Sequence, residues 1–131
     1  MKFKTSIHIL LGLLVAVILF HIAVIAKAIP YKIAWGGRLE NDQEMYVFEA
    51  ISILINLFLG FVLLMKASYI KFRFKKKAIN IILWIFFVLF VWNTVGNLFA
   101  KTNFEKSFAV LTFIFAILIW KILKTRKPWL H

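Results

Sequence analysis

Cysteine is absent from this 131-residue chain, and acidic side chains are scarce. Without cysteine the protein has no disulfide, no thiolate nucleophile and no thiolate metal site. Five residues are Asp or Glu against 17 Lys and Arg, and charged residues make up only 17% of the chain. A soluble domain of this length has more surface than so few polar residues could cover. The composition, 63% hydrophobic, therefore indicates an integral membrane protein of one domain.

Long apolar segments are what the sequence does contain. A membrane-spanning helix needs about 20 mainly apolar residues, and four segments qualify, at about 6–28, 42–67, 78–100 and 105–124. They predict an all-α fold: a single domain over 1–131 in which four transmembrane helices form a bundle. The first apolar run is longer than the roughly 7–15 residues of a signal peptide core. We therefore interpret it as a true helix.

Local signals support these helix ends. Pro30 is expected to end the first helix soon after Ala28. Asn41 is a candidate N-cap of the second helix, with Glu44 three residues later as its return partner. Thr102 and Glu105 form a T-x-x-E capping box for the fourth helix.

The charges divide between the two sides of the predicted bundle. The N-terminus, the loop at 68–77 with the adjoining helix ends, and the C-terminal tail carry no acid. Their cations are Lys2, Lys4, Lys66, Lys71, Arg73, Lys75, Lys76, Lys77, Lys121, Lys124, Arg126 and Lys127. The opposite loops, including 29–41, balance Lys27, Lys32, Arg38, Lys101 and Lys106 against Glu40, Asp42, Glu44, Glu49 and Glu105. By the positive-inside rule both termini are expected to be cytoplasmic.

This charge pattern also predicts the partners of the protein. Because the net charge of +12 lies on the predicted cytoplasmic face, we expect contact with anionic lipid of the bilayer there, and no nucleic-acid partner. The predicted location is the inner (plasma) membrane, as a multi-pass protein. A homo-oligomer or a membrane partner protein is also possible, because Gly12 and Ala16 form a small-residue pair that suits helix association.

Polar side chains inside the helices gather in the predicted outer half. A polar group in hydrocarbon is costly and normally marks either helix packing or a site. The inner half is almost entirely apolar, whereas the outer half and its loop hold the candidate ligand-binding residues. They are His21, Arg38, Glu49, Ser52, Asn56, Asn93 and Asn97. Arg38, in the WGGRL loop, is expected to pair with Glu49 or to hold an anionic ligand. Alternatively, the three asparagines hydrogen-bond one another across helices and serve packing alone.

No specific catalytic signature is present. A His21–Glu49 pair could move a proton as an acid–base or transport site. His8 and His21 are 13 residues apart, a spacing known for ligation of two haems, but facing ligands are lacking. The sequence shows no phosphate-binding loop, zinc cluster or nucleophile elbow. We therefore expect no cofactor and no metal. We also expect a binding or transport protein rather than an enzyme.

Two blocks, "IPYKIAWGGRLENDQEMYVFE" and "WNTVGNLFAKTNFEK", carry a resemblance. With the helices between them, the chain resembles a group of small four-helix bacterial integral membrane proteins. The resemblance implies the same topology and a bacterial inner-membrane location, and it implies no particular activity.

These observations leave three hypotheses for function. The first is a protein that binds or transports a small solute or ion in an outward-facing polar pocket. The second is an accessory subunit in which the polar cluster only holds helices together. The third is a membrane enzyme that acts on a lipid-soluble substrate with Glu49 and His21 as its acid–base pair.

Overall fold

The computed structural model describes residues 2–31, 40–99 and 103–125, with the side chains of Phe104 and Glu105 excepted. Long helices make up most of these ranges. They are α1 (Phe3–Ile25), α3 (Asp42–Lys66), α4 (Lys76–Leu98) and α5 (Asn103–Lys124). The all-helical prediction is confirmed. Each predicted span overlaps one of these helices, and the ends differ by up to three residues.

All four helices are long and apolar enough to cross a membrane. Their most apolar windows have mean hydropathies between 2.0 and 2.7. Because a helix rises about 1.5 Å per residue, helices of 22–25 residues are about 33–38 Å long. That length exceeds the roughly 30 Å hydrocarbon core of a bilayer. The chain is therefore a multi-pass membrane protein by length and composition.

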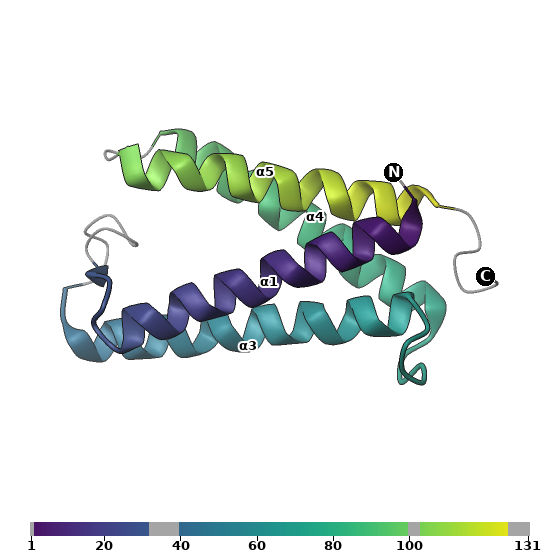
Figure 1. Ribbon diagram of the computed structural model, residues 1–131, viewed down its shortest axis with the longest axis horizontal. Helices are drawn as coiled ribbons and strands as arrows, with labels where there is room; N and C mark the ends of the chain where they lie inside the picture. The colour runs from purple at the N-terminus through teal and green to yellow at the C-terminus, as the bar shows by residue number, and fades with distance from the viewer. Residues whose placement is uncertain (1, 32–39, 100–102, 126–131) are drawn as a thin grey trace.

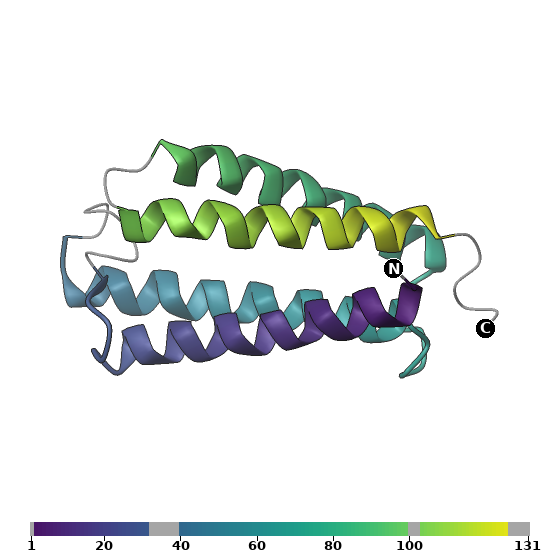
Figure 2. The same cartoon turned by 45° about the horizontal axis from the view of Figure 1, so that its top comes forward.

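The helices form two antiparallel pairs, α1 with α3 and α4 with α5 (Figures 1 and 2). Contacts also join α1 to α5 and α3 to α4, so each helix has two neighbours around the bundle. Since consecutive helices run in opposite directions, the start of α1 and the end of α5 lie at the same end of the bundle (Figure 1).

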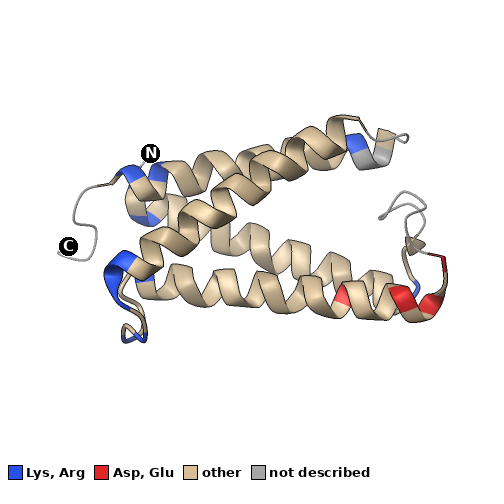
Figure 3. Ribbon diagram, turned by 180° about the vertical axis from the view of Figure 1, so that it is seen from behind, with Lys and Arg blue, Asp and Glu red and all other residues tan. Residues whose placement is uncertain are grey.

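Charge separates along the bundle axis (Figure 3). One end, which we call the basic end, holds the start of α1, the α3–α4 loop and the end of α5, and the described residues there carry Lys and Arg without acid. At the other end, which we call the acidic end, lie Glu40, Asp42 and Glu44. The predicted grouping of charges into two sets is therefore present in three dimensions.

Helices α1 and α3 end in the same hydrogen-bonded motif. Lys27 and Ser68 have φ values of 62° and 64°, in the left-handed region. After α1, Lys27 N–H donates to Val24 O at 3.0 Å and Ala28 N–H donates to Ala23 O at 2.9 Å. These two backbone hydrogen bonds form a Schellman motif, which satisfies the last carbonyl groups of a helix. The helix therefore ends before Pro30 can terminate it, three residues earlier than the sequence predicts.

The N-cap of α3 matches the predicted residue. Glu44 N–H donates to Asn41 Oδ1 at 2.9 Å. The Glu44 carboxylate does not return to the Asn41 backbone; instead it lies 3.5 Å from the side-chain amide of Asn41. The Thr102–Glu105 capping box predicted for α5 lies outside the described residues.

Asn41→Ala is expected to destabilise the start of α3 by about 1 kcal/mol, the usual value for a lost side-chain cap. The free N–H groups of the first turn would lose the Asn41 acceptor. Denaturant unfolding of the detergent-solubilised protein measures this cost. Asn41→Asp keeps an oxygen acceptor and should retain most of the stability, so equal losses in both variants would contradict the capping role.

The buried residues of the hydrophobic core that all four helices share lie in the half of the bundle toward the basic end. They begin at Ile7 in α1 and at Ile122 in α5, and none lies beyond the middle of its helix. The partly buried Val17, Phe90 and Leu111 pack against them from just past the middle. The buried members of the core are Ile7, Leu10, Leu14, Leu59, Val62, Leu63, Met65, Ala67, Ile79, Leu83, Phe86, Phe115, Leu118, Ile119 and Ile122. Packed apolar side chains therefore close this half of the bundle.

The half toward the acidic end is built differently. Among the described residues its buried apolar cluster consists of Val24 and Met45, which join α1 to α3 only. The α1–α3 and α4–α5 pairs also move apart toward this end (Figure 1). A ring contact between Phe20 and Phe108, with centroids 5.3 Å apart, links α1 to α5 there. Among the described residues, the two pairs thus share no fully buried cluster in the half that contains most of the predicted site.

Candidate functional site

His21 and Glu49 meet between α1 and α3. Nδ1–H of His21 donates to Oε2 of Glu49, although the two residues are 28 positions apart in sequence. The Glu49 side chain is 0% exposed and the His21 side chain 14% exposed. The sequence placed both residues in the same half of the bundle, and the structure adds that they face each other.

The apolar stripes of two helices bring this pair together. On α3, Met45 and Glu49 lie one turn apart, on the side that continues to Leu59 in the shared core. On α1, His21 is three residues before Val24, which packs against Met45. The pair therefore lies within the α1–α3 interface, at a position that apolar side chains would otherwise occupy.

A buried carboxylate is costly in any protein, and more so in hydrocarbon. A hydrogen-bonded imidazole offsets part of this cost by sharing a proton with the carboxylate. Such a pair can hold a proton, release it, or exchange it for a cation or a hydrogen-bond donor on a ligand. These are the chemical options that the geometry offers.

Ser52 and Asn56 continue the Glu49 side of α3 and are half-buried. Asn56 Nδ2–H donates to the backbone oxygen of Ser52 at 2.7 Å. This bond lies within one helix. Asn56 therefore does not link α3 to another helix through that amide, as it would if the asparagines only held the bundle together.

Asn93 and Asn97 lie on α4, in the other helix pair. Asn93 is exposed and Asn97 is half-buried. Neither side chain hydrogen-bonds to another residue of the described ranges. The structure thus brings His21 and Glu49 together, keeps Ser52 and Asn56 on the same side of α3, and places the two α4 asparagines on a helix of the other pair. Arg38 lies outside the described residues.

Two polar contacts between helices were not predicted from the sequence. Thr94 and Thr112 hydroxyls lie 2.8 Å apart between α4 and α5, and each also bonds a carbonyl of its own helix. At the basic end, Lys66 is 1% exposed and its Nζ donates to Asn80 Oδ1 at 2.5 Å. Counting charges assigned Lys66 to the solvated basic face, whereas it is buried in the junction of α3 and α4. Asn80, a polar residue in an otherwise apolar span, was the available signal.

A surface ion pair lies beside the site at the acidic end. Lys27 Nζ donates to Asp42 Oδ2 at 2.5 Å, and both side chains are about half exposed. The hydrogen bond and charge of Asp42 raise the pKa of Lys27 above its usual value. This pair joins the turn after α1 to the start of α3 at the acidic end.

Within the described residues no group of three His, Cys, Asp or Glu side chains is arranged to hold a metal ion. His8 and His21 have separate partners. Nε2 of His8 lies 2.7 Å from the Tyr69 hydroxyl, and the His8 imidazole stacks on the Tyr69 ring. Comparison with known proteins adds no identification: no family model, no curated protein and no solved structure matches the chain.

Proposed function

We propose that this protein binds a small solute or ion at the His21–Glu49 pair, in the half of the bundle that faces outward, and transfers it across the membrane or senses it there. One observation carries the proposal: a fully buried carboxylate paired with imidazole, in the half where the described residues of the two helix pairs share no fully buried cluster. Neutral side chains could join α1 to α3 at lower cost. A titratable pair is therefore better explained by binding and release.

The proposed orientation has both termini in the cytoplasm of a bacterial cell and the chain in its inner membrane. The basic end then meets anionic lipid and the acidic end faces outward. In this orientation the packed core closes the cytoplasmic half, and the pair lies in the half nearer the outer surface. Transport would require the packed half to open.

Packing alone is the main alternative. It fits Thr94 and Thr112, whose hydroxyls bridge α4 and α5. It fits the asparagines less well, because Asn56 bonds within its own helix and Asn93 is exposed. An enzyme that uses Glu49 and His21 as acid and base would need a substrate at the same pair, so it shares the binding step of the proposal.

Ligand-dependent thermal stability of the purified protein in detergent tests the proposal. A panel of inorganic cations, amines, amino acids and organic anions is screened at two pH values. A ligand present at about 100 times its Kd stabilises the folded state by about 2.7 kcal/mol. We expect at least one panel member to raise the Tm of the wild type, and Glu49→Gln to abolish that shift.

Asp42→Asn is the matched control for Glu49→Gln. It makes the same acid-to-amide change at the same end of the bundle, on a side chain that is half exposed. The ligand response should survive it. If no panel member stabilises the wild type, or if Glu49→Gln responds as the wild type does, the pair is structural and the proposal is wrong.

A further inference from the structure

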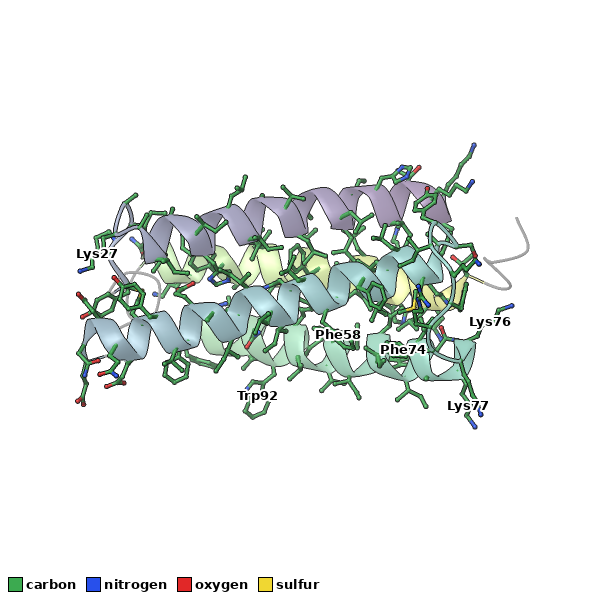
Figure 4. The ribbon with its side chains drawn as sticks, turned by 90° about the horizontal axis from the view of Figure 1, so that it is seen from below. Lys27, Phe58, Phe74, Lys76, Lys77 and Trp92 are labelled. Atoms are coloured by element: carbon green, nitrogen blue, oxygen red, sulfur yellow. The ribbon has the colours of Figure 1, made fainter. Side chains whose placement is uncertain are left out.

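An apolar groove runs between α3 and α4 on the outside of the bundle. Its volume is about 410 Å³, and among its lining residues are Leu54, Ile55 and Phe58 of α3 and Ile85 and Leu89 of α4. Phe58 lies on the side of α3 that faces α4 (Figure 4), and its ring centroid is 6.4 Å from that of Phe86. This groove is separate from the Glu49 site, which lies on the α1 side of α3.

The groove lies at hydrocarbon depth. Leu54 and Phe58 are 12 and 16 residues from the start of α3, or about 18–24 Å along the helix. No charged residue occurs between Ala50 and Met65 of α3 or between Ala78 and Leu98 of α4. Its occupant in a membrane is therefore apolar over this length and carries no charge that needs a counter-charge.

The lining side chains disfavour another helix as the occupant. Helices that associate in membranes use small residues, because these let two backbones approach closely. The groove is lined by large Leu, Ile and Phe side chains. A flexible hydrocarbon chain can follow such a surface, whereas a rigid helix about 10–12 Å wide would be held away from it.

A polar group marks one end of the groove. Asn93 follows Leu89 by four residues, so it lies one turn nearer the acidic end on the same side of α4. Asn93 is exposed and has no hydrogen bond to another residue of the described ranges. An amide without a partner in hydrocarbon is costly, and it offers one donor group and one acceptor to a ligand.

We propose that the groove binds a single-chain, uncharged amphiphile of the membrane leaflet at the acidic end. Its apolar chain lies along Leu54, Phe58 and Leu89, and its carbonyl- or hydroxyl-bearing head group hydrogen-bonds to Asn93. The volume is that of a site for one small ligand. The chain supplies most of the contact, and the amide fixes the depth and direction of the head group.

Photolabelling in lipid vesicles tests this assignment. The full-length protein is reconstituted with a monoacylglycerol that carries a diazirine in the middle of its chain, and labelled positions are mapped by mass spectrometry. We expect label on the groove residues of α3 and α4 to exceed, several-fold, label on Val15 and Val110, which are exposed on α1 and α5. Unlabelled monoacylglycerol should compete, and a fatty-acid anion should compete poorly.

Matched variants separate a site from general contact with lipid. Leu89→Trp fills the groove and should remove most of the label there, whereas Val15→Trp, at a similar depth on α1, should leave it unchanged. Asn93→Leu should reduce groove labelling and Asn93→Gln should preserve it. Equal labelling of all exposed helix faces, or groove labelling that survives Leu89→Trp, would overturn the proposal.

The absence of native cysteine allows a second test. In the single-cysteine variant Asn93→Cys, efficient disulfide cross-linking between two copies in the membrane would assign this side of α4 to a second copy of the chain and overturn the lipid assignment. We expect cross-linking no stronger than that of Val110→Cys. Neither result bears on ligand binding at Glu49, so the two proposals can fail independently.

Discussion

Leu63→Ala is expected to lower the free energy of unfolding by about 2 kcal/mol, near the low end for a buried leucine. Leu63 is 0% exposed in the core shared by all four helices. In a membrane the unfolded helix would place the same side chain in lipid, so the loss is mainly of packing rather than of transfer from water. The cavity left behind opens within a cluster to which all four helices contribute.

Leu54→Ala is the control, since it makes the same change nine residues earlier on the same helix. Leu54 is 65% exposed, and its loss should change stability by no more than about 0.5 kcal/mol. Both variants are compared by unfolding in mixed detergent micelles, followed by circular dichroism. Equal costs would mean that Leu63 does not lie in a packed core from which Leu54 is excluded.

The sequence does not show that Leu63 is buried and Leu54 is exposed. Both lie in one continuous apolar run, so hydropathy predicts the span but not which side faces the core. The same limit applies to Asn56 and Asn93, which the sequence places in the same half of the bundle. In the structure Asn56 is half-buried on the Glu49 side of α3, whereas Asn93 is exposed beside the groove.

The features that could be predicted from the sequence depend on the length of the apolar segments, on the charges at their ends and on the position of residues along the helices. The spans of the four helices follow from runs of about 20 apolar residues, and the two charged ends follow from counting Lys, Arg, Asp and Glu. The placement of His21 and Glu49 in the same half of the bundle could also be predicted. Their contact could not, because it requires α1 and α3 to be neighbours with a particular rotation. The burial of Lys66 depended likewise on how the α3–α4 loop brings Asn80 against it.

Removal of the imidazole from the buried pair is the second prediction with a large effect. His21→Leu leaves the Glu49 carboxylate buried without its imidazole partner, and breaking a buried pair in this way costs about 3 kcal/mol. Glu49→Leu should cost less, about 1–2 kcal/mol, because no carboxylate stays buried and the lost hydrogen bond of the imidazole is the main effect. The two single variants are thus expected to be unequal.

The double variant His21→Leu, Glu49→Leu distinguishes a coupled pair from two separate polar residues. Replacing both partners by apolar side chains of similar volume is often neutral or stabilising, so the double variant should be more stable than His21→Leu alone. A double-mutant cycle should give a coupling energy of about 3 kcal/mol, the upper end of the usual range, so that the double variant loses no more stability than Glu49→Leu does. Additive losses would show that the contact between α1 and α3 contributes nothing of its own.

The cycle also separates stability from function. If the pair is kept for binding, the double variant should fold at least as well as either single variant and still fail to respond to the ligand that stabilises the wild type. If the pair is kept for packing, the double variant should be the least stable of the set. A fully buried carboxylate in a membrane helix is selected against on stability alone. We therefore expect the first outcome: a stable protein that has lost its ligand.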